Sequence, residues 1–392
     1  KMVNQNIFNL VEPPIPLALS WGDDYNNEFG PVIDMSQAVP DYLPHPILLE
    51  NFKKAASDQT LLSYGEIQGE AILRKNYAQH LSEKYISEVK PEQTMITSGC
   101  NQAFVSTILS LAKSGEEVLL SNPGYFSHEL SLKMLGIKPV FFNLNPKEEF
   151  NFRLEDLERK INRNVKAIIL VSPNNPTGTI YNDKLLNAVL SLCKKNNIFL
   201  ILDETYRDFI FPKKNCPHLL LQNKDWSSNF IQLYSFSKSC CIPGHRLGAI
   251  TADKNIIAQI SKVMDNIQIC PPRPAQCAVG NFLPYLKKFQ HEKSEEIGEK
   301  AELFKRVMNK FSIWEITSIG AFFAYVKHPY KDKDCSEVSK KLATKYGIIS
   351  IPGNYFGSNQ KNYLRMSIAG LSNIEINEVP NRLKKLDEIF EV

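Results

Sequence analysis

The sequence predicts an α/β protein: a large domain with a mostly parallel sheet sandwiched by helices, joined to a smaller α+β domain. Three observations predict this class. From about residue 46 to 269, short apolar runs of strand length alternate with helical segments. In the last third, a long charged helix precedes mixed strands and helices. Between them, Pro271, Pro272 and Pro274 interrupt helix. We therefore expect a large domain at 46–270, and a small domain made of an N-terminal arm, 1–45, and residues 271–392.

The strands of the large domain are predicted from apolar runs at 95–97, 117–121, 139–144, 167–171, 198–202 and 230–234. Helical segments lie between them at 102–113, 126–135, 154–161 and 184–195. Strands joined by helices run parallel, and the helices bury both faces of the sheet. The small domain is predicted to contain helices at 292–310, 336–346 and 374–390 and strands at 321–326 and 363–368.

The composition excludes several classes of protein. The chain has 392 residues, 43% hydrophobic and 22% charged, which excludes a disordered protein. Its net charge is +4 and no block of Lys or Arg occurs, so no nucleic-acid partner is expected. The longest apolar stretches are too short to span a membrane, and no secretory signal is visible. The eight Cys form no C-x-x-C pair, so we expect no metal, reduced thiols and a cytoplasmic location.

The most informative pattern follows the last apolar run of the large domain. It contains Ser235, Ser237 and Lys238, with Arg246 eight residues after the lysine. Two hydroxyls and a guanidinium make a good site for a dianion, and a lysine among cations becomes a nucleophile. When this pattern is considered alone, an ordinary surface loop with Ser and Lys is the slightly favoured interpretation. Ser235-x-x-Lys238 also matches penicillin-binding enzymes, but their Lys–Thr–Gly and Ser–Asp–Asn elements do not occur here.

Two more patterns follow apolar strands. Asp203 and Tyr206 come after 198–202, and Asp203 is either a helix cap or a carboxylate facing a cationic ring nitrogen. The loop Ser172-Pro-Asn-Asn175-Pro-Thr-Gly178 is either only a tight turn or a rigid mount for the Asn175 amide.

Two further patterns also follow predicted apolar strands. Gly99, Cys100 and Asn101 link a strand to a helix, where backbone N–H groups and the helix dipole favour a phosphate. Tyr125 places an aromatic ring after another strand, although ordinary packing explains it equally well when considered alone. Because ligands bind at the carboxyl ends of parallel strands, all five patterns can face one crevice.

In their order and spacing, these patterns resemble the class I/II aminotransferases, pyridoxal phosphate-dependent enzymes of fold type I, over residues 40–369. The resemblance implies that Lys238 forms a Schiff base with pyridoxal 5'-phosphate and later moves a proton. It implies that Asp203 keeps the pyridine nitrogen protonated, which makes the ring an electron sink. Tyr206 and Asn175 would donate to the ring oxygen, and Tyr125 would stack on the ring.

The resemblance also assigns the cofactor phosphate and the substrate. The phosphate would be held by Gly99, Cys100, Asn101, Ser235, Ser237 and Arg246. Tyr64 would reach the phosphate of the neighbouring subunit, so a homodimer with shared active sites is implied. Arg365, in Tyr363-Leu-Arg-Met-Ser, would clamp the substrate carboxylate with its two-pronged guanidinium, next to Asn175 and Ala38.

The chain departs from the family pattern at a few positions. Ala38 stands where a glycine is usual and would narrow the space beside the substrate carboxylate. Cys100 replaces Ser, Thr or Ala, which is harmless if only its N–H group is used. Cys240 and Cys241 follow the lysine closely and would make the site sensitive to oxidation. Arg273 is more often structural at such a position, but could bind a distal substrate carboxylate.

We therefore expect an aminotransferase that moves an amino group from an L-amino acid to a 2-oxo acid by a ping-pong mechanism. Two alternatives remain open at this point. The first is a lyase that eliminates the β-substituent of a sulfur amino acid, since the same Lys, Asp and Arg serve both reactions. The second is a non-catalytic sensor that binds the cofactor, against which the intact Lys238, Asp203 and Arg365 argue.

Overall fold

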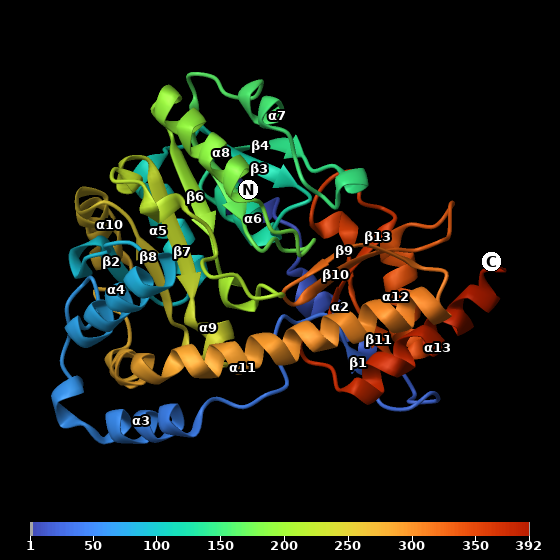
Figure 1. The fold of residues 1–392 in the computed structure, drawn as a ribbon. Helices are drawn as coiled ribbons and strands as arrows, with labels where there is room; N and C mark the ends of the chain where they lie inside the picture. The colour runs from blue at the N-terminus through green and yellow to red at the C-terminus, as the bar shows by residue number, and fades with distance from the viewer. Residues whose placement is uncertain (1–2, 392) are drawn as a thin grey trace.

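The computed structural model describes residues 3–391, which form two principal sheets linked by one long helix (Figure 1). Over these residues the larger sheet has seven strands in the order β2-β8-β7-β6-β5-β3-β4. They are β2 (Thr94–Thr97), β3 (Glu117–Asn122), β4 (Lys138–Asn143), β5 (Val165–Val171), β6 (Phe199–Asp203), β7 (Phe230–Ser235) and β8 (Gly248–Thr251). β8 runs antiparallel to β2 and β7, whereas the other neighbours are parallel. The predicted mostly parallel sheet is confirmed.

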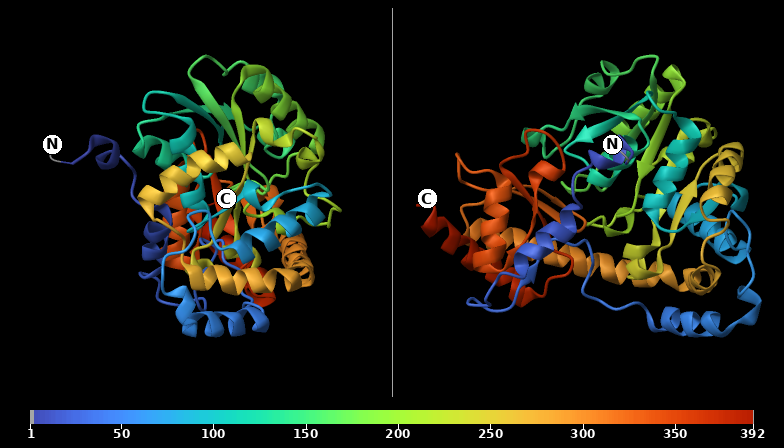
Figure 2. Two further views of the ribbon diagram at one scale, coloured as in Figure 1. Left: turned by 90° about the vertical axis from the view of Figure 1, so that its left-hand side faces the viewer. Right: turned by 180° about the vertical axis from the view of Figure 1, so that it is seen from behind.

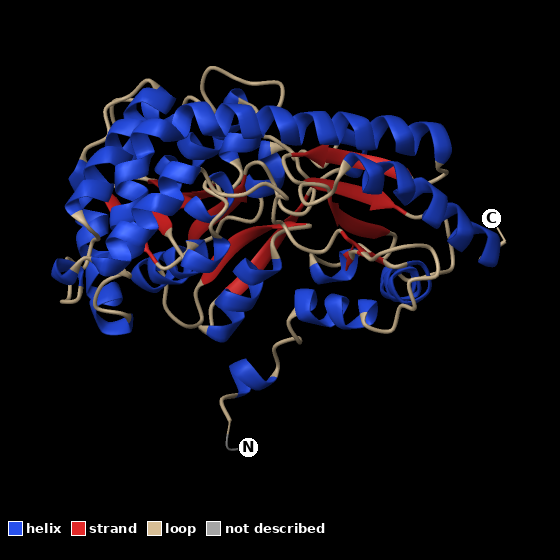
Figure 3. Ribbon diagram, turned by 90° about the horizontal axis from the view of Figure 1, so that it is seen from below, coloured by secondary structure: helices blue, strands red, loops and turns tan. Residues whose placement is uncertain are grey.

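Helices cover both faces of this sheet, as the view from below shows (Figure 3). Along β6, Leu200 and Leu202 belong to one buried cluster and Ile201 to another, the alternation that a strand with two buried faces requires. The first face is covered by α4 (Ala71–Tyr85), α7 (Leu154–Glu158) and α8 (Asp183–Asn196). The second is covered by α5 (Cys100–Leu111), α6 (Phe126–Met134) and α10 (Lys254–Ile267).

The smaller sheet is antiparallel, in the order β12-β13-β10-β9. Its strands are β9 (Glu315–Gly320), β10 (Phe323–Lys327), β12 (Ile351–Pro352) and β13 (Tyr363–Ser367). It packs against α12 (Cys335–Tyr346) and α13 (Asn373–Ile389) through a core that includes Trp314, Leu342, Leu364 and Leu383. A short parallel pair, β1 (Ile33–Asp34) with β11 (Ile348–Ile349), attaches the N-terminal part of the chain to this region.

The long helix α11 (Arg273–Phe311) has 39 residues and passes from the larger sheet to the smaller one. The prediction of a helix limited to 292–310 was wrong at its start. Pro274 lies in the first turn, where its missing N–H group costs nothing, so the Pro-rich stretch starts a helix as well as ending one. α11 contacts α3 (Pro46–Ser57) and α4 near one end and α13 near the other. Because α11 contacts helices from both sides of residue 270 in the sequence, the division into domains at that residue stays a proposal.

The N-terminal part of the chain contains α1 (Gln5–Phe8) and α2 (Pro14–Gly22). α1 contacts α6 but projects from the body of the molecule in the left view of Figure 2 and in the view from below in Figure 3. Its residues, and Val3 and Val11 beside it, are exposed although several are apolar. Among residues 3–391, no helix is both long and apolar enough to cross a membrane.

Candidate active site

The predicted site residues gather at the carboxyl edge of the larger sheet, where it faces the smaller one. A cavity of about 260 Å³ lies there. Its lining contains Ala38, Cys100, Asn101, Tyr125, Asn175, Asp203, Tyr206, Ser235, Ser237, Lys238, Arg246 and Arg365. The convergence follows from topology, because parallel strands bring their carboxyl ends to the same edge. Arg365 comes from β13 of the smaller sheet, so both sheets build the cavity.

Lys238 lies on α9 (Phe236–Ser239), a single turn of helix that follows β7 directly. Ser235 caps this turn by accepting a hydrogen bond from the N–H group of Ser237 over 3.2 Å. The Nζ of Lys238 donates to the carbonyl oxygen of Ala38 over 2.6 Å. Burial, with the nearby charges of Arg365 and Arg246, lowers the pKa of Lys238 to about 8. The neutral, nucleophilic form of the amine is therefore more abundant near neutral pH than it is in a lysine with the ordinary pKa.

Asp203 ends β6 and is buried among groups that favour its ionised form. One oxygen, Oδ1, accepts bonds from the N–H and hydroxyl groups of Thr205 over 3.0 and 2.7 Å. The other, Oδ2, lies 3.1 Å from the Nε2 of His128. Burial alone would raise the pKa of Asp203, but His128 and Thr205 outweigh it, and the net pKa is lowered. The buried side chain is thus a carboxylate that can face a cation.

Sequence reasoning missed His128 and Thr205. His128 stacks on Phe104 with ring centroids 4.3 Å apart and meets the edge of Tyr125 at 5.1 Å. A signal was present, because His128 comes three residues after Tyr125, which places both on one side of the start of α6. For Thr205, the signal was a hydroxyl two residues after an aspartate, the spacing of an Asx turn.

Gly99 and Arg246 form the part of the site at the start of α5. Gly99 has a φ of +85°, which favours glycine, and a Cβ there would lie 2.2 Å from Nη2 of Arg246 and would displace the guanidinium. The first N–H groups of α5, from Cys100 onward, have no partners within the helix and carry its positive dipole end. Nearby, Ser237 Oγ is buried with no hydrogen-bond partner among the described residues. This corner therefore presents several free donors to an anion.

Arg365 is fully buried at the opposite side of the cavity. Its Nη1 donates to Oδ1 of Asn175 over 2.9 Å, and its Nη2 donates to the carbonyl oxygen of Ser36. Its Nε finds no partner within residues 3–391. Burial lowers the pKa of Arg365 to about 10, so the guanidinium stays charged at neutral pH. Asn175 is fixed by its loop, in which Gly178 passes so near to Gly320 that a side chain could not fit.

Two tyrosines line the cavity. Burial raises the pKa of both Tyr125 and Tyr206, so both hydroxyls are protonated donors at neutral pH. Tyr206 is positioned by edge-on contacts with Phe322 and Phe323, at 5.3 and 5.0 Å between ring centroids.

Tyr64 is not part of this cavity in the single chain. Its side chain is 79% exposed. Arg273 supports the segment that precedes Tyr64. Its Nη1 donates to the carbonyl oxygens of Thr60 and Ser63, and its Nε pairs with Oε1 of Glu70 at 2.6 Å. These contacts occupy Arg273 and favour the structural interpretation of this residue.

Cys240 and Cys241 follow Lys238, but neither has the surroundings of a reactive thiol. Burial raises the pKa of Cys240 to about 12 and also raises that of Cys241. Both thiols are therefore protonated at neutral pH, which argues against the predicted sensitivity to oxidation.

The family model described as aminotransferase class I and II matches residues 30–383. The chain belongs to the class I and II aminotransferases. It is 29% identical to an aspartate aminotransferase of Sulfolobus acidocaldarius, over 92% of this chain and 90% of that protein. It is 27% identical to the aromatic aminotransferase ISS1 of Arabidopsis thaliana, over 90% and 89% of the two chains.

Among solved structures, a single mutant of the Thermus thermophilus aspartate aminotransferase superposes with a TM-score of 0.90 at 20% identity, covering 98% of this chain and all of that one. This aminotransferase therefore has the expected fold. It is a transferase that exchanges amino groups between amino acids and 2-oxo acids, and members of its family use pyridoxal phosphate. Membership of this family supports a transferase and does not favour the lyase.

Proposed function

We propose that this aminotransferase binds pyridoxal 5'-phosphate in the cavity and uses Lys238 to move an amino group from an L-amino acid to a 2-oxo acid by a ping-pong mechanism. One observation carries the proposal: Lys238, Asp203 and Arg365 line the same cavity although they come from three different elements, α9, β6 and β13. This set combines an amine of lowered pKa, a buried carboxylate and a charged guanidinium.

The polar groups of the cavity fit the cofactor. The free Ser237 hydroxyl, the start of α5 and Arg246 suit its phosphate. Asp203 suits its ring nitrogen, because the carboxylate is buried yet held ionised. Tyr206 retains its proton and can donate to the ring oxygen. When bound, pyridoxal phosphate supplies an aldehyde that receives the amino group and a protonated ring that withdraws electrons from the reacting carbon.

The protein groups then have separate tasks. Arg365 would hold the substrate carboxylate through its free Nε and turn the Cα–H bond toward Lys238. Lys238 would take the proton from the substrate Cα and pass it to the C4′ carbon of the cofactor. An amine with a pKa of about 8 is suited to this task. Asn175 uses its oxygen to hold Arg365, which leaves its amide N–H group as a donor.

We also propose a homodimer in which Tyr64 completes the site of the partner subunit. Three features support it: Tyr64 is exposed on a segment braced by Arg273, α1 projects from the body, and Phe8 on α1 is 72% exposed. Sedimentation should give twice the mass of the chain. Tyr64→Phe should weaken binding of the cofactor without changing that mass. A cytoplasmic location is part of the same proposal, in keeping with the eight unpaired cysteines of the described residues.

The decisive experiment follows the visible absorbance of the cofactor bound to the purified protein. Each amino acid of a panel is added without and then with a 2-oxo acid, and the new amino acid is measured. The wild-type protein should change its absorbance with the amino acid and change back with the oxo acid. Lys238→Ala should abolish both changes, whereas Lys254→Ala, on the exposed start of α10, should leave them intact. An unaltered spectrum in Lys238→Ala would show that the lysine assignment is wrong.

A further inference from the structure

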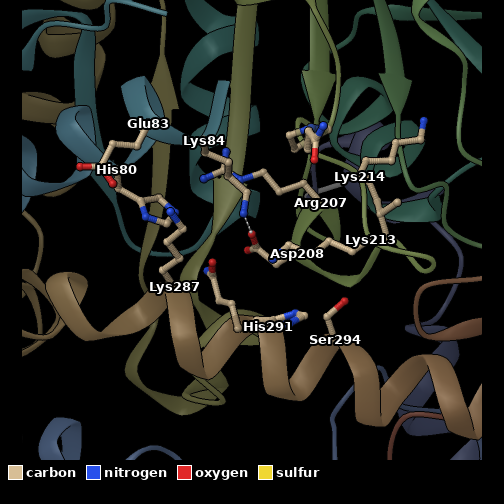
Figure 4. A pocket seen from close by; sticks show the side chains of 14 residues that line it. His80, Glu83, Lys84, Arg207, Asp208, Lys213, Lys214, Lys287, His291 and Ser294 are labelled. Atoms are coloured by element: carbon tan, nitrogen blue, oxygen red, sulfur yellow. Dashed lines mark ion pairs between the residues drawn. The ribbon is translucent and has the colours of Figure 1, made fainter. Parts of the chain in front are cut away.

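A second cavity, of about 160 Å³, lies among α4, α11 and the loop after the short 3-10 helix η4 (Arg207–Phe209) (Figure 4). Its lining residues differ from those of the active-site cavity. The volume corresponds to roughly five water molecules at about 30 Å³ each, which is room for one small anion or headgroup. Figure 4 shows Lys287, His291 and Ser294 rising from α11 toward side chains of α4 and η4.

The cavity is strongly cationic. Five cationic and two acidic side chains line it, which leaves three positive charges in excess. The cations are Lys84, Arg207, Lys213, Lys214 and Lys287, and the acids are Glu83 and Asp208. They come from α4, η4, the following loop and α11, so the positive charges surround the space instead of lying along one exposed helix face.

The floor of the cavity is a fixed network. Arg207 is 2% exposed, and its guanidinium carbon lies 3.6 Å from the ring centroid of Tyr234. Asp208 accepts a hydrogen bond from the Tyr234 hydroxyl over 2.5 Å and pairs with Lys84 at 2.6 Å. The buried carboxylate is thus already neutralised by its own partners and does not compete for the exposed lysines.

Several buried nitrogen atoms around the cavity have no partner. They are Nε and Nη1 of Arg207, Nε2 of Gln290, Nε2 of His80 and Nδ1 of His291, none of which finds a hydrogen-bond partner between residues 3 and 391. Gln290 is 5% exposed, so its side chain is nearly as buried as that of Arg207. Unpaired buried polar atoms are unusual in folded proteins and commonly mark a place for a water or an ion, and the nitrogens of Arg207 and Gln290 are donors. Here the surplus positive charge selects an anion.

We infer that this cavity binds phosphate, either the free ion or the phosphate group of a small metabolite. Donors reach the space in different directions from α4, η4, the loop after η4 and α11, which suits a tetrahedral oxyanion better than a planar carboxylate. Lysine, arginine and neutral amide donors are the groups that bind phosphate in proteins. The opening between exposed Lys213, Lys214 and Lys287 gives the ligand access from solvent.

The test is calorimetric titration of the cofactor-saturated protein, so that the proposed cofactor-phosphate site is already occupied. Inorganic phosphate and glycerol 3-phosphate are titrated separately at constant ionic strength, with sodium chloride as the reference salt. We expect saturable binding at one site per chain. Tighter binding of glycerol 3-phosphate would identify a metabolite as the ligand, and equal or weaker binding would identify the free ion.

Two variants and one matched control place the binding in the cavity. Lys287→Glu and the double variant Lys213→Glu/Lys214→Glu should each raise the dissociation constant at least tenfold. Lys288→Glu changes the same charge one residue along α11, on a side chain that is 88% exposed and outside the lining, and should leave the constant unchanged. Binding that is absent in the wild-type protein, or equal in all variants, would overturn the inference. The visible absorbance of the cofactor tests the proposed function separately.

Discussion

The Nζ of Lys238 lies 2.6 Å from the carbonyl oxygen of Ala38, so the N-terminal segment is tied directly to the reactive lysine. The contact uses a main-chain atom, which explains how the chain accommodates alanine where the family usually has glycine. It also holds the amine inside a buried space that Arg365 and Arg246 make more positive. Burial and the positive charges of Arg365 and Arg246 disfavour the ammonium form and lower the pKa of Lys238 to about 8.

This pKa predicts the pH dependence of cofactor uptake. Only the neutral amine attacks an aldehyde, and a lowered pKa makes this form available at lower pH. The rate at which the cofactor-free protein takes up pyridoxal phosphate should rise with pH, reach half its maximum near pH 8 and then level off. Stopped-flow absorbance between pH 6 and 10.5 measures this rate. A continued rise up to pH 10 would mean that Lys238 keeps the pKa of an exposed lysine.

Replacement of Asp203 tests whether the reaction needs the charge of this side chain. Asp203→Asn keeps the shape of the side chain but removes the charge, and kcat should fall at least about a hundredfold. His128→Asn keeps the carboxylate but removes the contact that helps lower its pKa. In that variant the acidic limb of the kcat profile should move to higher pH, with a smaller loss at pH 8. Equal losses at every pH in His128→Asn would show that this histidine acts only through packing.

Gly99 and Gly115 offer a matched pair of substitutions. Both have positive φ, +85° and +87°, so replacement by alanine should destabilise each by about 1 kcal/mol. A Cβ at Gly99 would meet Arg246, whereas a Cβ at Gly115 would meet no atom within 4 Å of it among the described residues. Thermal unfolding should therefore show similar losses for the two variants. Only Gly99→Ala should bind pyridoxal phosphate more weakly, which equilibrium titration measures.

Arg365→Lys should impair the use of the substrate more than the binding of the cofactor. Lysine keeps the positive charge but lacks the planar guanidinium whose nitrogens serve Asn175, Ser36 and the substrate at once, and it leaves Asn175 without its partner. We expect kcat/KM for the amino acid to fall about a hundredfold, which corresponds to roughly 2.7 kcal/mol. The affinity for pyridoxal phosphate should change little. A matching loss of affinity for pyridoxal phosphate would show that Arg365 binds the cofactor and not the substrate.

The sequence predicted most of the candidate site because the relevant side chains follow buried strands. Asp203, Asn175 and Lys238 each come within four residues of the end of an apolar run, and parallel topology brings such positions together without any knowledge of side-chain packing. His128 was missed because it lies inside a helix, where the sequence resembles an ordinary amphipathic face. The bond between Lys238 and Ala38 was missed because main-chain contacts between segments 200 residues apart leave no local pattern.

The fold shows a similar limit. Six of the seven strands of the larger sheet were located to within a few residues, because their apolar runs are bounded by polar turns. The strand β8 was not predicted, because its four residues form a short run that begins with a glycine. The start of α11 was misplaced by 19 residues, because the charged repeat that indicates a solvated helix is confined to its second half. The first half is buried against α3 and α4, where apolar and small residues replace the charged pattern.

The continuity of α11 restricts how the molecule can close around a substrate. At about 1.5 Å per residue, its 39 residues form a rod of roughly 58 Å that contacts helices beside both sheets. A simple hinge at its first residue would carry the whole rod away from α3 and α4. Movement of the smaller sheet toward the cavity must instead bend the rod or slide its far end against α13. Pro284, which lacks an N–H group to donate inside the helix, provides the point of least resistance to bending.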